Sequence, residues 1–380
     1  MKHIDLILTL LISTVAFSQI PTGYYDSATG TGFVLKTQLK NIIDNNNDGL
    51  ATEYIAQDLG YSALYDTYEF SDIDVYFENN GTLLDMYSEG VFQNPDNTST
   101  NLPDAYEYTY GSNQQDDGTL GTAEGQRFNR EHVIPQSSFN SASPMRNDAH
   151  FVIPSDKYVN AQRANLPYGF VDTTTQFDEY SNGTKRGENT TTGVGSSYNG
   201  DVFEPIDEFK GDIARMYFFF ATRYEDQIDG FNYVMFDGTQ NQAIDQPFLD
   251  VLYNWHINDP VSQREIDRNN AIFNRQDNRN PFIDNPQFVF EIWQTALSVD
   301  EFQTQDIVKM YPNPANGNIV YIDSNINLVA EVYDVLGKKV NVQTINTNQK
   351  QLQISTLSRG VYLVKLTSEN GSITKKLIKQ

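Results

Sequence analysis

The 380-residue chain has no cysteine, few basic residues and only four histidines. Without cysteine it cannot form disulfides, which a chain of this length does not need because it can bury a sizeable core. Lysine and arginine number 26 against 50 acidic residues, and only Lys2, Lys36 and Lys40 precede Arg127. A net charge of −24 argues against non-specific, charge-driven binding of nucleic acid. A polyanionic ligand would need a local basic patch or bound cations.

Long apolar runs are also missing, apart from one at the N-terminus. Residues 6–17 are largely apolar, and Ala16-Phe17-Ser18 fits a cleavage site with small residues. This pattern predicts a secretory signal peptide over residues 1–18, with a buried N-terminal strand as the alternative. No later apolar stretch approaches the roughly 18 residues that a membrane-spanning helix needs.

The character of the sequence changes after residue 298. The polar segment SVDEFQTQD is followed by short β-rich runs at 319–322, 329–335, 360–366 and 373–379. Short strands at regular spacing predict a small β-sandwich. We therefore expect four segments: a signal peptide (1–18), a large domain (19–298), a linker (299–308) and a C-terminal β-domain (309–380).

Helical spacing marks two segments of the large domain. Residues 31–43 suit an amphipathic helix, and residues 209–227 are apolar on nearly every face, which predicts a central buried helix. The segment 44–50, DNNNDGL, begins like a calcium loop. Its twelfth position would be Ile55 instead of a bidentate glutamate, so a polar turn is the favoured interpretation.

Glutamate stands directly before histidine in FNREHVIPQSSFN (128–140). If residues 127–135 form a strand, Glu131 and His132 point to opposite faces. They could reach one site only at a strand end or a bulge, and Pro135 favours a strand end because it cannot continue the ladder. On the dipeptide alone, a surface glutamate beside a half-buried histidine is the alternative.

The next 35 residues favour a site. A second apolar run spans residues 150–153, and Ser155 can cap a helix that starts at Asp156. On that helix Asn160 and Arg163 are three residues apart and share a face. The order of strand, loop, strand and helix is a ββα unit.

The polar residues of this unit suit phosphodiester hydrolysis. Mg²⁺ prefers oxygen ligands and keeps several waters, so one carboxylate and one amide oxygen are a sufficient share from the protein. A neutral imidazole can take a proton from water near neutral pH. An arginine can hold a phosphate with two parallel hydrogen bonds.

Three motifs in order resemble the endonuclease I family of secreted and periplasmic nucleases, within the His-Me finger (ββα-metal) superfamily. They are NREHVIPQS (129–137), DAHFVIPSDKYVNAQRANLPYG (148–169) and FEPIDEFKGDIARMYFFFATRYE (203–225). The resemblance implies an α+β fold, with a mainly helical nuclease domain that contains the ββα-metal motif. It also implies that His132 is the general base, that Glu131 and Asn160 hold the metal, and that Arg163 is a catalytic phosphate contact or a scaffold contact.

The activity implied by the resemblance is cleavage of DNA, and also of RNA, with little sequence preference and with 5′-phosphate products. The implied cofactor is Mg²⁺, with Mn²⁺ or Ca²⁺ as alternatives. We further expect substrate contacts from Arg130, Arg146, Lys185 and Arg268, with a solvated helix charge as the alternative for Arg268. Asp148 and His150 are expected to support the site structurally, with a catalytic role as the alternative for His150.

An acidic cluster precedes the predicted central helix. Glu204, Asp207, Glu208 and Asp212 could form a second metal site. The favoured interpretation is that these residues cap the helix and interact with its dipole.

The end of the chain carries a second resemblance, in MYPNPANG (310–317), VYDVLGKKV (332–340), LSRGVYLVKL (357–366) and KKLIK (375–379). These segments are similar to the C-terminal sorting domain of type IX secretion cargo. The resemblance implies that the type IX machinery is a partner and that the protein is secreted or attached to the cell surface after outer-membrane translocation. No stable protein partner is expected.

Two other functions compete with a nuclease. One is a non-catalytic secreted protein that binds glycans or surfaces and carries the same sorting domain, which the acidic body favours. The other is a metalloprotease, which the sequence disfavours because it has no His-x-x-x-His pair.

Overall fold

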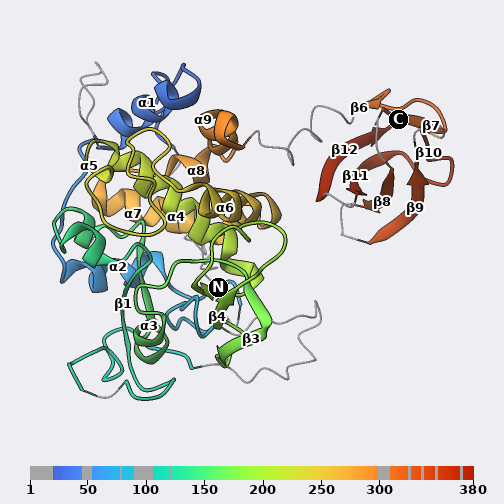
Figure 1. Cartoon of the computed structure of the whole chain (residues 1–380). Coiled ribbons are helices and arrows are strands. Elements are labelled where there is room, and N and C mark those ends of the chain that lie inside the picture. The colour runs from blue at the N-terminus through green and yellow to red at the C-terminus, as the bar shows by residue number, and fades with distance from the viewer. Residues whose placement is uncertain are drawn as a thin grey trace, which may run out of the picture. The chain divides into compact units, whose positions relative to one another are not determined.

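The computed structural model describes residues 20–44, 54–77, 79–89, 106–119, 121–297, 309–323, 327–334, 338–346, 350–368 and 371–380. The chain divides into two compact units, Met1–Gln294 and Thr295–Gln380 (Figure 1). The predicted signal peptide lies outside the described residues, as does most of the calcium-like segment 44–50.

Helices supply most of the regular secondary structure that is described in the first unit. They are α1 (Gly32–Asp44), α2 (Ala63–Ser71), α3 (Lys157–Arg163), α4 (Lys210–Arg223), α5 (Glu225–Ile228), α6 (Gln246–Asn258), α7 (Gln263–Gln276), α8 (Pro281–Asp284) and α9 (Phe288–Leu297). Every residue of α4 is buried, and this helix packs against α1, α6 and α8. The predicted central helix within residues 209–227 is thus confirmed, since apolar side chains on nearly every face require neighbours on all sides. The charged residues Asp212, Arg215 and Arg223 of this helix are buried in ion pairs.

Two small sheets complete the first unit. Strands β1 (Phe128–His132) and β2 (Val152–Asp156) pair antiparallel, with Glu131 opposite Ile153. Strands β3 (Val171–Glu179), β4 (Lys185–Asn189) and β5 (Asp201–Glu204) form a three-stranded sheet in that order. Short 3₁₀ helices η1 (Gln136–Phe139) and η2 (Met145–Asn147) lie between β1 and β2, and η3 (Asp207–Phe209) precedes α4.

Helix α3 begins one residue later than the sequence predicts. Asp156, not Ser155, is the N-cap, and its side chain accepts hydrogen bonds from the backbone N–H groups of Tyr158 and Val159 at 2.7 and 3.0 Å. A carboxylate satisfies two free N–H groups of the first turn and interacts favourably with the helix dipole. Strand β2 likewise starts at Val152 instead of residue 150. The predicted ββα order is confirmed as β1, β2 and α3.

The second unit is a β-sandwich. One sheet has the order β10-β7-β6 and the other β12-β11-β8-β9. The strands are β6 (Lys309–Tyr311), β7 (Ile319–Asp323), β8 (Leu328–Asp334), β9 (Lys339–Ile345), β10 (Gln351–Gln353), β11 (Gly360–Ser368) and β12 (Gly371–Lys379). The four runs that the sequence predicts correspond to β7, β8, β11 and β12, whereas β6, β9 and β10 were missed.

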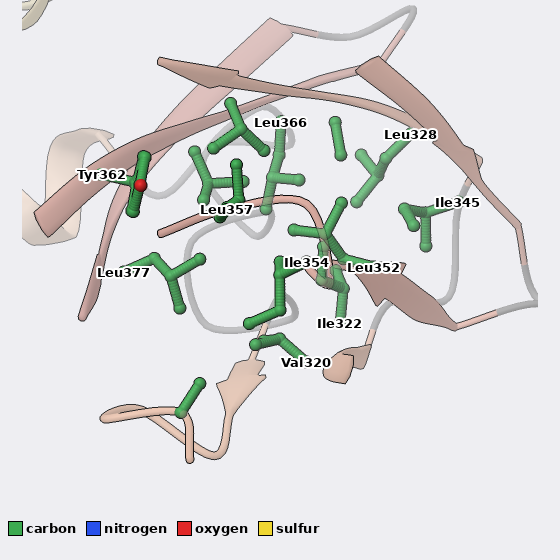
Figure 2. Close-up of a cluster of buried hydrophobic side chains, with 14 residues drawn as sticks. Val320, Ile322, Leu328, Ile345, Leu352, Ile354, Leu357, Tyr362, Leu366 and Leu377 are labelled. Carbon is green, nitrogen blue, oxygen red and sulfur yellow. The ribbon is translucent and has the colours of Figure 1, made fainter. Parts of the chain in front are cut away.

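Alternation of side chains builds the sandwich core. Val320 and Ile322 of β7 are buried while Tyr321 between them is exposed, because successive residues of a strand face opposite sides. The buried side chains of both sheets converge between the layers, where Leu352, Leu366 and Leu377 pack in one cluster (Figure 2). The described residues thus form a mixed α+β unit followed by an all-β unit, as predicted.

Within the part of the chain that the structure describes, no helix combines the length and apolar character needed to cross a bilayer.

Candidate active site

The candidate site is built at the end of a strand. Glu131 is the penultimate residue of β1 and His132 is the last, so their side chains leave the strand in different directions. Glu131 contacts Tyr87 and Arg163, whereas His132 contacts Tyr61 and Arg146. Although Glu131 and His132 are adjacent in the chain, their side chains therefore have different neighbours.

One hydrogen bond fixes the tautomer of His132. Its Nε2 lies 3.0 Å from the backbone carbonyl oxygen of Arg146. A carbonyl can only accept, so Nε2 must carry the hydrogen and donate it. In the neutral ring Nδ1 then has a free lone pair. The sequence predicts a backbone carbonyl near Asn147–Asp148 in this role, and the structure places the carbonyl of the preceding residue, Arg146 of η2, there.

The electrostatic surroundings keep His132 neutral. The side chain is almost buried, with 6% of its surface exposed. Burial lowers the pKa of His132 to about 4, and the positive charges of Arg146, Arg130 and Arg163 act in the same direction. The imidazole is therefore unprotonated at neutral pH and able to accept a proton.

Glu131 is buried more completely than a typical carboxylate. Its Oε1 accepts hydrogen bonds from the Tyr87 hydroxyl at 3.0 Å and from Arg163 Nη1 at 3.1 Å. Burial raises the pKa of Glu131 to about 7, although Arg163 and Tyr87 act to lower it. No side-chain donor to Oε2 is found among the described residues, so this oxygen is the one that could accept a cation.

Asn160 of α3 is oriented by contacts to β1. Its Nδ2 donates to Asn129 Oδ1 at 2.8 Å and, at 3.4 Å, to the carbonyl oxygen of Arg130. With the amide nitrogen held against the strand, Oδ1 is directed away from these partners. The side chain thus presents an oxygen near the strand that carries Glu131.

Arg163 has no surface to offer to a phosphate. Its side chain is 1% exposed, and its guanidinium donates to Glu131 Oε1, to His132 O at 2.9 Å and to Val133 O at 2.8 Å. These hydrogen bonds fix the backbone at the end of β1. The expectation that Arg163 contacts substrate therefore needs correction: the structure supports the scaffold alternative, because the guanidinium is buried and both of its terminal nitrogens bind protein oxygens.

Arg130 and Arg146 lie beside His132 and are half-buried. Both guanidiniums lie over the ring of Tyr61, with Cζ 3.5 Å and 4.1 Å from its centroid. The same ring is stacked with the imidazole of His132 at 5.8 Å between centroids. The two arginines predicted as substrate contacts thus share one aromatic neighbour next to the candidate base.

The other two predicted substrate contacts lie elsewhere. Arg268 of α7 is buried, with Nε 2.8 Å from Asp72 Oδ1 and Nη2 donating to the carbonyl oxygen of Ala149. It is neither a groove residue nor a solvated charge, because both expectations require exposure. Lys185 is the first residue of β4, opposite Glu204 in the register, and no described contact joins it to His132.

Asp148 and His150 are both interior residues. Asp148 accepts hydrogen bonds from Arg223 at 2.5 Å and Tyr224 at 2.8 Å. Burial alone would raise the pKa of Asp148, but Arg223 outweighs it and the pKa is lowered. His150 packs on Phe219 and its Nε2 lies 3.1 Å from the carbonyl oxygen of Asn278. These contacts support a structural role for both.

The acidic cluster before α4 is neutralised by protein cations. Lys210 pairs with Glu204 at 2.7 Å and with Asp207 at 2.6 Å, and Arg264 pairs with Asp212. Among the described residues no group of three or more histidine, aspartate or glutamate side chains is arranged to hold a metal. The idea of a second metal site here is not supported, because three of the four carboxylates of the cluster are paired with protein cations.

Sequence reasoning missed the tyrosines of the site. Tyr87 donates to Glu131, and its oxygen contacts the hydroxyl of Tyr168. Tyr233 contacts Arg163, and Tyr61 contacts His132. With 23 tyrosines in the chain, nothing in the local sequence distinguishes these four from core residues. Their proximity to the site arises from tertiary packing.

Both units of the chain are similar to known proteins. Residues 31–287 match Endonuclease I, and residues 309–380 match the secretion system C-terminal sorting domain. The chain is similar to an extracellular ribonuclease of Bacillus amyloliquefaciens, 32% identical over 278 residues, which cover 71% of this chain and 78% of that protein. It is also similar to an extracellular ribonuclease of Bacillus subtilis (strain 168), 33% identical over 278 residues with the same coverage.

Proposed function

Because the chain belongs to the endonuclease I family, we propose that it is a secreted endonuclease that hydrolyses both DNA and RNA, with a divalent cation, to 5′-phosphate products. The nuclease class follows from the family, so the glycan-binding alternative is set aside. The observation that carries the proposed mechanism is the hydrogen bond from His132 Nε2 to the Arg146 carbonyl, which leaves Nδ1 as a base.

In this mechanism His132 accepts a proton from the attacking water. The water then attacks phosphorus in line with the departing 3′ oxygen. Arg130 and Arg146 bind the phosphate oxygens, and Arg163 holds the strand end so that the imidazole keeps its position. General base catalysis of this kind contributes about 10²- to 10⁴-fold to a rate.

The donor set fits a hard divalent cation such as Mg²⁺, for which oxygens are the preferred ligands. Glu131 Oε2 and Asn160 Oδ1 are the atoms that would hold it, since their partner atoms Oε1 and Nδ2 are already engaged. When bound, the cation would neutralise charge on the phosphate oxygens and the leaving oxygen. Two protein ligands leave room for the several waters that Mg²⁺ retains.

We propose both DNA and RNA as substrates because of the nucleophile. Water activated by His132 attacks either backbone, because the 2′-hydroxyl of RNA takes no part in the reaction. An enzyme that used the 2′-hydroxyl would cleave RNA only and would leave 2′,3′-cyclic phosphates. The two Bacillus relatives carry the name ribonuclease, which is compatible with the RNA half of the proposal.

We expect purified protein to cleave plasmid DNA and a labelled RNA with Mg²⁺, and to lose about 10²-fold or more of the rate in EDTA, given the several kcal/mol that a cation supplies. Products are identified by their ends. Attack by water leaves a 5′-phosphate, which accepts ligation, on both DNA and RNA, whereas attack by the 2′-hydroxyl leaves a 2′,3′-cyclic phosphate and a 5′-hydroxyl on RNA. Cleavage of RNA alone with cyclic ends, or activity unaffected by EDTA, would contradict the proposal. Mn²⁺ and Ca²⁺ serve as alternative metals in the same assay.

The raised pKa of Glu131 gives a dependence on pH and metal. Below about pH 7 this carboxyl is protonated, and a protonated carboxyl does not bind a cation, so protons and Mg²⁺ compete for it. We expect the apparent Mg²⁺ requirement to be higher at pH 6 than at pH 8, with activity at pH 6 recovering as Mg²⁺ is increased. His132, with a pKa of about 4, stays unprotonated at both values. An identical Mg²⁺ requirement at both pH values would contradict this expectation.

The second unit marks the chain as an exported protein, since it matches a secretion sorting domain. We propose the boundaries that the sequence indicates: a signal peptide over residues 1–18, the nuclease over 19–298, a linker over 299–308 and the sorting domain over 309–380. The chain divides into two compact units between Gln294 and Thr295, which supports these boundaries. The type IX secretion machinery is the proposed partner of the sorting domain.

A further inference from the structure

Most arginines of the first unit are neutralised by carboxylates. Eleven arginines lie between Arg127 and Arg279, and eight of them form an ion pair with an aspartate or glutamate. Within the described residues the three without such a pair are Arg130, Arg146 and Arg275. In a chain with 50 acidic residues, two arginines that lie beside one histidine and lack a carboxylate need an explanation.

The contacts of these two arginines are of a different kind. Arg130 Nη1 donates to the backbone oxygen of Tyr61 at 2.9 Å, and its Cζ also lies 4.3 Å from the ring centroid of Tyr65. No hydrogen bond of the Arg146 side chain is found in the described part of the chain. Its Cζ lies 4.1 Å from the ring centroid of Tyr61.

An aromatic ring orients a guanidinium without cancelling its charge. The negative face of the ring attracts the cation, and flat contact restricts the rotation of the long side chain. A carboxylate would orient it equally well but would occupy the N–H groups that bind phosphate. Contact with Tyr61 therefore leaves both positive charges uncancelled. Among the described residues, Arg130 Nη2 and the two Nη atoms of Arg146 have no protein acceptor and are the atoms that would bind an anion.

We propose that Tyr61, Arg130 and Arg146 form a binding site for one backbone phosphate of the nucleic-acid substrate beside His132, and that Tyr61 is its positioning residue. This inference rests on the proposed function and specifies how the site holds its substrate. The two Cζ atoms lie no further apart than the sum of their distances to the ring centroid, so both guanidiniums can bind one phosphate. The ring contacts of Tyr61 are taken by two cations and the imidazole, which argues against Tyr61 as a stacking surface for a base.

The test measures binding without turnover. Affinity of the full chain for a fluorescent single-stranded oligonucleotide is measured in EDTA over a salt series, with inorganic phosphate as competitor. We expect Tyr61→Leu to raise Kd by about 5- to 30-fold, as the loss of two cation–π contacts implies. Tyr61→Phe, which keeps the ring, should stay within about twofold, because the hydroxyl makes no contribution to these contacts. Inorganic phosphate should compete less well in Tyr61→Leu than in the wild type.

Arg275 supplies a matched control. It too lacks a carboxylate partner and lies over an aromatic ring, that of Phe70, with Cζ 5.7 Å from the centroid, but its Nε donates to Thr67. Arg146→Gln should reduce the slope of log Kd against log salt by about one, the value for a single phosphate contact. Arg275→Gln removes the same charge and should leave the slope unchanged. Thermal unfolding of each variant verifies that it is folded.

Three results would overturn the inference. They are an unchanged Kd in Tyr61→Leu, equally weak binding in Tyr61→Phe, and equal effects of Arg146→Gln and Arg275→Gln. Failure of the proposed function is a separate result, because binding is measured without metal and without cleavage. A wild-type protein that binds the oligonucleotide through this site but does not cleave it with any divalent metal would contradict the function and leave the phosphate site supported.

Discussion

Replacing His132 with alanine is expected to lower kcat on both DNA and RNA by about 10²- to 10⁴-fold, the usual contribution of a general base. Both the geometry and the pKa of His132 make it an available base. The Arg146 carbonyl holds the hydrogen on Nε2, and burial keeps the pKa near 4, so Nδ1 is an available base at neutral pH. Alanine removes the acceptor while the strand end stays in place, because Arg163 bonds the backbone oxygens there.

The measurement is single-turnover cleavage at saturating enzyme with Mg²⁺, which isolates the chemical step from binding. Affinity for the oligonucleotide in EDTA should change little in His132→Ala, since the phosphate contacts are those of Arg130 and Arg146. Added imidazole should restore part of the rate, because a small base can enter the space left by the side chain. A variant with undiminished kcat would rule out His132 as the base.

Replacing Arg163 with methionine is expected to lower the free energy of unfolding of the first unit by about 3–5 kcal/mol, the range for breaking a buried ion pair. The substitution leaves Glu131 buried with only Tyr87 as a side-chain donor. It also removes the donor to the carbonyl oxygens of His132 and Val133. Because the affected backbone carries the site, activity of the folded fraction should fall as well.

Tryptophan fluorescence during urea unfolding measures this effect in the right unit. The chain has two tryptophans, Trp255 and Trp293, and both are buried in the first unit, so the sorting domain does not contribute to the signal. The matched control is Arg186→Met, which removes a partly exposed ion pair with Asp178 and should cost at most about 1 kcal/mol. Equal losses in the two variants would contradict the scaffold role of Arg163.

The sequence was most informative where a pattern has only one stable arrangement. A helix that is apolar on nearly every face is expected to be central, and α4 is buried along its whole length. Short β-rich runs at regular spacing predict a β-sandwich, and the second unit has that fold. The ββα order was visible from two apolar runs and a capped helix, although propensity could not choose between Ser155 and Asp156 as the cap, since both are good N-cap residues.

The roles of individual cations were the least predictable part. The sequence predicts substrate contacts for Arg130, Arg146 and Arg268 alike, and for Arg163 it leaves a phosphate contact and a scaffold contact open. Folding buries Arg163 against Glu131 and Arg268 against Asp72, while it leaves the other two over Tyr61. Whether an arginine is structural or free to bind depends on which carboxylate reaches it, and the partners are 32 to 196 residues away in the chain.

The sequence by itself determined the two-unit organisation, the central helix, the ββα order and the adjacency of Glu131 and His132, because these depend on local pattern and covalent order. Tertiary structure alone decided which carbonyl fixes the tautomer of His132, how deeply Glu131 is buried and that Tyr61 lies against Arg130 and Arg146. The physical reason is that each of these depends on atoms brought together from distant segments: a carbonyl on η2, a hydroxyl at Tyr87 and a ring that precedes α2.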